Sequence, residues 1–195
     1  MKILIATHNP AKIKDYCQLL EKEGFKVETL ASLDIRERFA EHQDSFEQNA
    51  QNKALFYYNL AKIPTIAEDG GFEIDYLNGE PGIKSRRWPG HEATDEEIVN
   101  YLREKIKEIP QDQRSAKFTA VTCLIKSPNE IYQAKNSLEG YLIEVMRKDY
   151  PTGWPYRAFF IEKNFNKYLM DLTEAEYNQI NHRLKNIEEL IKYLN

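Results

Sequence analysis

The sequence has 195 residues, of which 42% are hydrophobic and 30% charged, enough apolar material to bury a core. Its formal net charge of −4, from 27 Lys and Arg against 31 Asp and Glu, excludes the broad basic surface that grips nucleic acid. No apolar stretch approaches the roughly 20 residues that span a bilayer. Two cysteines and the lack of a secretory signal indicate a reduced, cytoplasmic protein. We therefore expect one domain over residues 1–195, with neither a nucleic-acid nor a membrane partner.

The first half of the chain predicts an alternation of strands and helices. A short apolar run, typical of a buried strand, ends where Asn9 can cap a helix that begins at Pro10. A second helix, predicted over residues 45–61, opens on a capping box and carries an apolar stripe. Residues 65–67 then predict a short strand, followed by a bend at two glycines and a second strand over residues 72–77.

The second half predicts a central strand and further helices. Capping residues open three helices: Thr94 with Glu97, Thr173 with Glu176, and Asn181 alone. Residues 116–125 are apolar on both alternations, which indicates a central strand. Strands over 131–134 and 141–146 are expected to be joined by a turn around Gly140. A tail helix carries an apolar stripe over 184–194. This mixture of elements predicts an α/β fold with a mixed sheet.

The segment from Thr7 to Lys12, Thr-His-Asn-Pro-Ala-Lys, is the first candidate site. It joins a strand end to a helix start, where first-turn backbone N–H groups and the helix dipole favour anions. The Thr7 hydroxyl, the Asn9 amide and the Lys12 ammonium would add contacts to phosphate. By spacing alone, an ordinary capped helix with a solvated lysine is the commoner form of such a segment.

Acidic residues form a second candidate site, for magnesium. Glu41 precedes the second helix, and the pair Glu68-Asp69 stands at a strand end before two glycines. Magnesium prefers a few carboxylates together with water and phosphate oxygens. If the strand continues through the pair, Glu68 and Asp69 point to opposite sides, so one of them is expected to face the ligand. Solvated loop acids are the alternative interpretation.

Basic and aromatic side chains elsewhere could complete a nucleotide site. The basic candidates are Lys53, Arg87, His182 and Arg183, the last two lying off the tail's apolar stripe. Trp154 and Tyr156, in a loop bracketed by prolines, could stack on a base. Solvated basic residues and plain packing of the loop on the sheet are the competing interpretations.

Taken in order, these segments resemble the motifs of the inosine triphosphate pyrophosphatase family, whose members clear non-standard purine nucleoside triphosphates. Residues 7–12 resemble Thr/Ser-x-Asn-x-x-Lys, and residues 45–54 resemble Thr-Phe-x-Glu-Asn-Ala-x-x-Lys-Ala. Residues 67–72 are similar to Ala-Glu-Asp-Ser-Gly-Leu, and the run 78–88 follows. Residues 181–183 resemble Ser-His-Arg. Several motifs in one order are far more specific than any motif alone.

The resemblance implies a long mixed, twisted sheet flanked by helices, with two lobes around a central cleft, in a homodimer. It implies magnesium-dependent hydrolysis of a nucleoside triphosphate to the monophosphate and pyrophosphate. By position, phosphate binding would fall to Thr7, His8, Asn9, Lys12, Lys53, Gly70 and Arg87. Metal binding would fall to Glu41 and Asp69, with Asp69 also activating water. Base binding would fall to Trp154, Tyr156, Arg157, Tyr177, His182 and Arg183.

The sequence departs from the family pattern mainly among the base-binding positions. Phe-Gly-Tyr-Asp-Pro becomes residues 154–158, so an aspartate that can accept from a 6-keto purine is replaced by Arg157, which only donates. The lysine expected five residues before His182 is Tyr177, and the serine after the aspartate is Gly70. The preferred base therefore stays open. The alternative function is a nucleotide-binding protein with altered base specificity, or without turnover, that acts as a sensor.

Overall fold

The structure, a computed structural model, describes residues 1–40 and 44–194. The chain divides into two compact units. Unit 1 comprises Met1–Gly70, Ala120–Asn136 and His182–Asn195, and unit 2 comprises Gly71–Thr119 and Ser137–Asn181. Each unit has a hydrophobic core of its own.

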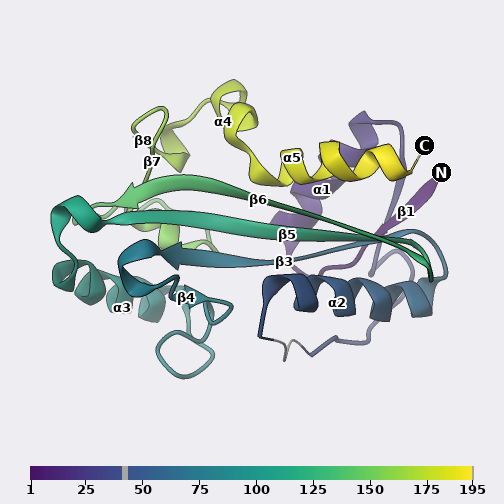
Figure 1. Ribbon diagram of the computed structural model, residues 1–195, viewed down its shortest axis with the longest axis horizontal. Helices are drawn as coiled ribbons and strands as arrows, with labels where there is room; N and C mark the ends of the chain where they lie inside the picture. Colours follow the sequence, from purple (N-terminus) through teal and green to yellow (C-terminus); the bar gives the residue numbers. More distant parts are fainter. Residues whose placement is uncertain (41–43, 195) are drawn as a thin grey trace. The chain divides into compact units, whose positions relative to one another are not determined.

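The described residues form one eight-stranded sheet in the order β2-β1-β3-β5-β6-β7-β8, with β4 paired to β3 (Figure 1). The strands are β1 Lys2–Ile5, β2 Lys26–Thr29, β3 Thr65–Ile74, β4 Pro81–Gly82, β5 Ser115–Ser127, β6 Glu130–Leu142, β7 Phe160–Glu162 and β8 Lys167–Tyr168. Strand β1 pairs in parallel with β2 and β3, whereas β3 with β4, β6 with β7, and β7 with β8 pair antiparallel. The sheet is mixed and flanked by helices, so the predicted α/β class is confirmed.

The α-helices are α1 Pro10–Lys22, α2 Phe46–Ala61, α3 Asp95–Glu108, α4 Glu174–Ile180 and α5 His182–Leu190. Of the three predicted capping boxes, those at Thr94 and Thr173 are complete, and at the third the Ser45 hydroxyl accepts from the backbone N–H of Gln48. Strand β2 was not predicted. None of the described helices is long and apolar enough to cross a bilayer.

In unit 1, α1 and α5 lie on one face of the sheet and α2 lies on the other (Figure 1). Side chains alternate between the faces along each strand. Ala134 of β6 joins the core beneath α1 and α5. Its neighbours Gln133 and Lys135 reach α2 instead, where they bond the Glu47 carbonyl at 3.0 Å and the Glu47 carboxylate at 2.8 Å. The alternation of side chains along the strand therefore decides which helix each polar group can contact.

Unit 2 is built around a cluster of aromatic rings. The Phe72 ring stacks on Tyr156 with centroids 4.7 Å apart, and Phe118 lies 4.8 Å from Phe72 and 4.9 Å from Phe160. Helix α3 covers this cluster with the apolar stripe that its spacing predicts: Ile98, Leu102 and Ile106, each at most 1% exposed. Such aromatic pairs stabilise a core beyond their buried area.

Two predicted strand breaks are wrong. Strand β3 runs unbroken through Gly70 and Gly71, and β6 runs unbroken through Gly140. The physical reason is close packing, because a Cβ on Gly71 would meet Ser85 Oγ at 2.6 Å and a Cβ on Gly140 would overlap the Ile161 carbonyl oxygen and the Phe160 ring. These glycines therefore let another segment of the same chain pack closely against a strand, and they do not mark turns.

Candidate functional site

The segment from Thr7 to Lys12 connects β1 to α1, as predicted. The backbone N–H of Asn9 donates to Thr7 Oγ1 at 3.2 Å, and Asn9 Oδ1 accepts from the Lys12 N–H at 3.4 Å. Asn9 therefore occupies the predicted N-cap position. Thr7 is buried, so the turn is held against the protein interior. The first-turn N–H groups of α1 stand at this fixed turn, at the positive end of the helix dipole.

A buried ionic cluster at Glu68 ties this segment to the sheet. The Glu68 side chain is only 2% exposed, and the Arg183 guanidinium donates to both of its oxygens, at 2.8 and 3.1 Å. Lys12 Nζ lies 3.1 Å from Glu68 Oε1, and the Tyr16 hydroxyl donates to Oε2 at 2.6 Å. Glu68 thereby fixes the direction of the Lys12 side chain, which sequence reasoning assigns to phosphate.

The electrostatics of this cluster favour a charged Glu68. Burial acts to raise the pKa of the Glu68 carboxyl, but the charges of Arg183 and Lys12 outweigh burial and hold it well below its usual range. Burial, reinforced by the Glu68 charge, raises the pKa of Tyr16 well above its usual value. The tyrosine therefore stays neutral and can only donate to Glu68 or accept from a neighbour.

Asp69 follows Glu68 on β3, so its side chain points to the opposite face, the one that carries α2 in unit 1. Asp69 is 8% exposed, and its Oδ1 accepts from the Gly70 N–H at 2.8 Å. From α2, Lys53 Nζ approaches the Glu68 carbonyl oxygen at 3.5 Å. The structure thus brings Lys53 and Asp69 to the α2 face of β3, whereas Lys12 meets the Glu68 side chain on the opposite face.

The predicted metal ligands are only partly described. Glu41 lies outside the described residues. Within residues 1–40 and 44–194, no three His, Cys, Asp or Glu side chains gather closely enough to hold a metal ion. Magnesium, however, is commonly held by one or two carboxylates together with water and substrate phosphates. The Asp69 carboxylate fits that mode of binding.

Five predicted site residues belong to unit 2. The Arg157 guanidinium lies over the Trp154 ring, 4.6 Å from its centroid. Tyr156 is 5% exposed, stacks in the core and donates its hydroxyl to the Ser85 carbonyl at 2.6 Å, so burial raises its pKa. Tyr177 packs against the same core, and Arg87 is exposed. Base binding by this group stays a prediction.

His182 and Arg183 stand differently from what the tail's apolar stripe suggests. Both are buried, at 2% and 3% exposure, on the face of α5 that meets the sheet. They lie outside the predicted apolar stripe and are nevertheless buried, because the buried face of α5 is partly polar: Asn186, fully buried, donates to the Ala120 carbonyl at 3.0 Å and to Thr122 Oγ1 at 2.9 Å. Their role toward a base stays a prediction.

Comparison with known proteins decides the family. A sequence profile described as the Ham1 family matches residues 3–193. The chain belongs to the Ham1 family. Two proteins named dITP/XTP pyrophosphatase are 34% identical to it. That of Bacillus subtilis (strain 168) aligns over 191 residues, 98% of this chain and 96% of the relative, and that of Vibrio cholerae over 194 residues, 98% and 95%. The resemblance to the inosine triphosphate pyrophosphatase family is thereby confirmed.

Solved structures of Ham1 proteins share the fold. A Ham1 protein from Coxiella burnetii superposes with a TM-score of 0.86 at 26% identity, covering 100% of this chain and 98% of that one. The Staphylococcus aureus Ham1 protein gives a TM-score of 0.83 at 27% identity, with the same coverage. The Ham1 fold therefore extends over the whole of this chain.

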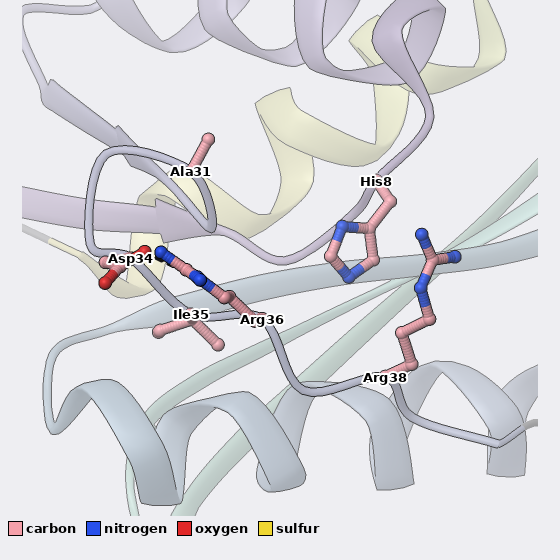
Figure 2. Close-up of a pocket in the computed structure, with 6 residues that line it drawn as sticks. All are labelled: His8, Ala31, Asp34, Ile35, Arg36 and Arg38. Atoms are coloured by element: carbon pink, nitrogen blue, oxygen red, sulfur yellow. Dashed lines mark hydrogen bonds and ion pairs between the residues drawn. The ribbon is translucent and has the colours of Figure 1, made fainter.

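Sequence reasoning missed two features beside the Ham1 motifs. The first is the support of the site by Tyr16 and Asn186, whose partners lie 52 to 106 residues away along the chain. The second is a hollow between His8 and the segment that follows β2 (Figure 2). Arg36 and Arg38 in that segment were the available signal, since the planar guanidinium group suits phosphate recognition.

Proposed function

We propose that the chain hydrolyses non-standard purine nucleoside triphosphates, such as dITP and XTP, to the monophosphate and pyrophosphate, with magnesium. Its dITP/XTP pyrophosphatase relatives, similar over nearly their whole length, support this activity. The structural observation that carries it is the placement of Lys53 and Asp69 on one face of β3, with Lys12 held at the adjacent Glu68 beside the start of α1. Such an activity removes aberrant nucleotides from the pool, and we propose that it operates in a homodimer.

The residues at this site divide between phosphate binding and activation of water in the proposed reaction. The first-turn N–H groups of α1, the Thr7 hydroxyl and the ammonium groups of Lys12 and Lys53 bind and neutralise the phosphates. Phosphoryl transfer depends mainly on such alignment and charge neutralisation. Asp69 accepts a proton from the attacking water. A magnesium ion, when held by Asp69 and Glu41, would supply further neutralisation of phosphate charge.

The base is the open part of the substrate. Arg157, whose guanidinium lies over Trp154, offers donors where the family's aspartate offers an acceptor. We therefore propose that keto oxygens of the base, more than its N–H groups, are recognised by this loop. Measuring pyrophosphate release from a panel of ITP, XTP, their deoxy forms and the four common triphosphates, each with magnesium, ranks the bases directly.

The same assay tests catalysis. Asp69→Asn removes the base but keeps the side-chain shape, so we expect kcat to fall by a factor of about 10² to 10⁴. Asp112→Asn, at an exposed position in unit 2, makes the same chemical change and should leave kcat unchanged. Full activity in Asp69→Asn contradicts the assigned role. Tight triphosphate binding by the wild type without pyrophosphate release supports a sensor instead of an enzyme.

A further inference from the structure

A hollow of about 390 Å³ lies beside the Thr7–Lys12 segment in unit 1 (Figure 2). We call it the His8 hollow, and its lining is His8, Ala31, Asp34, Ile35, Arg36 and Arg38. One water takes up about 30 Å³ of liquid, so the hollow has room for a diphosphate group and several waters. The proposed activity uses none of its lining except His8.

The backbone around Arg38 is anchored on both sides. Tyr57 of α2, 1% exposed, donates its hydroxyl to the Glu37 carbonyl at 3.0 Å, and the Tyr57 hydroxyl oxygen accepts from the Phe39 N–H at 3.3 Å. His8 Nε2 lies 3.4 Å from both the Glu37 carbonyl oxygen and the Tyr57 hydroxyl oxygen. The wall that carries Arg38 is therefore fixed to both α2 and the phosphate segment.

The opposite wall is a tight turn that carries Arg36, whose side chain is exposed. The Ile35 N–H donates to the carbonyl of buried Leu30 at 2.9 Å, and Asp34 adopts a left-handed conformation with φ of 51°. Arg36 Nε donates to Asp34 Oδ1 at 2.9 Å. This pair uses one edge of the guanidinium, and an arginine has five N–H donors. Figure 2 shows Arg38 and His8 on one side of the hollow, with Arg36 and Asp34 on the other.

The charges of the lining suit an anion with several oxygens. Two guanidinium groups stand against one carboxylate, and planar guanidinium groups bind phosphate through paired hydrogen bonds. His8 lies directly between Thr7 and Asn9, and neighbouring Cα atoms are about 3.8 Å apart. A phosphate bound at the start of α1 is therefore one residue away from the His8 hollow.

We propose that the His8 hollow binds the terminal phosphates of the triphosphate, and after cleavage the pyrophosphate product, through Arg36 and Arg38. This inference rests on the proposed function, since it extends the phosphate contacts of the same site. It makes the two arginines determinants of the preference for a triphosphate chain. The monophosphate half of the substrate makes no contact with them.

The double variant Arg36→Ala/Arg38→Ala tests the proposal. Each lost charge-assisted contact corresponds to roughly a tenfold loss of affinity or more. We expect the KM for triphosphate and the inhibition constant of pyrophosphate to rise at least tenfold, with kcat within about twofold, because binding contacts made equally before and during reaction change KM alone. Inhibition by the monophosphate product should be unchanged. Arg38→Lys keeps the charge but loses the planar guanidinium group. Its KM for triphosphate should lie between those of the wild type and the double variant.

Two controls make the result specific. Lys22→Ala removes one cation at the far end of α1, so it measures the general effect of charge in unit 1. Calorimetric titration of wild type and double variant with inorganic pyrophosphate measures the hollow without turnover. If wild type hydrolyses triphosphates and the double variant binds pyrophosphate equally well, the hollow is not the site. If orthophosphate competes as strongly as pyrophosphate, its assignment to a diphosphate group is overturned.

Failure of the proposed function gives a different pattern from failure of this inference. A wild type that releases no pyrophosphate from any nucleotide contradicts the activity. In that case a pyrophosphate affinity that falls tenfold in the double variant still supports the hollow as a diphosphate site. An unchanged affinity overturns the hollow as well.

Discussion

Glu68 is a buried carboxylate whose charge is balanced within the protein. Removing a charge from water is costly unless partners with good geometry compensate it. Arg183 supplies two hydrogen bonds, Lys12 an ion pair and Tyr16 a third hydrogen bond. The cluster links α1 and α5 to β3 within unit 1. Loss of one member of the cluster should therefore lower the free energy of unfolding substantially.

Glu68→Gln is the substitution that exposes this cost. The amide keeps the shape but removes the nearest counter-charge of the buried Arg183, while the Asp15 carboxylate, 3.8 Å from Arg183 Nη1, remains. We therefore expect the free energy of unfolding to fall by about 3 to 5 kcal/mol. Urea denaturation measures the change. Glu104→Gln, which disturbs only the exposed pair with Lys107, should leave the unfolding free energy nearly unchanged. A Glu68→Gln protein as stable as wild type contradicts the proposed importance of the cluster.

The Glu68 cluster also predicts a pH dependence. The pKa of Glu68 is lowered in the folded protein, whereas a glutamate in the unfolded chain has a pKa of about 4.3. Its contribution to stability is therefore complete well above pH 4.3 and declines as pH falls below that value. We expect the stability gap between wild type and Glu68→Gln to narrow between pH 5 and pH 3. Urea curves at a series of pH values check this, and a gap that stays constant contradicts it.

Sequence reasoning reached part of this residue-level arrangement. The two-residue period of a strand predicts that Glu68 and Asp69 point apart, and the opposite partners of Gln133 and Ala134 show the same rule on β6. The identity of the partners was out of reach. Arg183 is 115 residues from Glu68 along the chain, and no local pattern reports a contact at that separation.

At the scale of elements, local signals succeeded and packing signals failed. Capping boxes at Thr94 and Thr173 act within four residues, so sequence alone identifies them. Gly71 and Gly140 were interpreted as a bend and a turn because glycine is common in both. The structure shows a different reason, the close approach of β4 to Gly71 and of β7 to Gly140, and a local glycine signal does not report such tertiary contacts.

Gly140→Ala tests the packing explanation. An added Cβ would overlap the Ile161 carbonyl and the Phe160 ring, so β7 must shift, and we expect a loss of about 1 to 3 kcal/mol in unfolding free energy. Gly153→Ala is the matched control: its Cβ would meet nothing within 4 Å, and the cost is only that of a φ of 86°, about 1 kcal/mol. Chemical denaturation of both variants compares them. Equal losses would contradict the close-packing explanation.

At the scale of the molecule, composition and motif order predicted the class of fold and the family. The division of the chain is finer than sequence showed, because β3, β5 and β6 each contribute residues to both compact units. The predicted phosphate residues Thr7, Lys12 and Lys53 all belong to unit 1. The strands pass from one unit to the other at Gly70-Gly71, Thr119-Ala120 and Asn136-Ser137, three pairs that share no common sequence pattern.

The net charge of −4 makes the proposed binding of a polyanion depend on local cations and on metal. A non-hydrolysable ITP analogue with magnesium, at 100 times its Kd, should stabilise the folded chain by about 2.7 kcal/mol. In a chain of this size that raises Tm by about 5 to 11 °C. Differential scanning calorimetry measures the shift.

Chelation of magnesium separates the contribution of the metal to phosphate binding from that of the cationic side chains. With EDTA in place of magnesium, only groups of the protein itself neutralise the triphosphate, so we expect most of the Tm shift to disappear. Asp69→Asn should weaken the magnesium-dependent part and leave the part seen in EDTA, because an amide is a poorer magnesium ligand than a carboxylate. Inosine without phosphates should shift Tm little in either buffer. An equal shift with magnesium and with EDTA would mean that cationic side chains bind the phosphates alone, and Asp69 would then act without a metal.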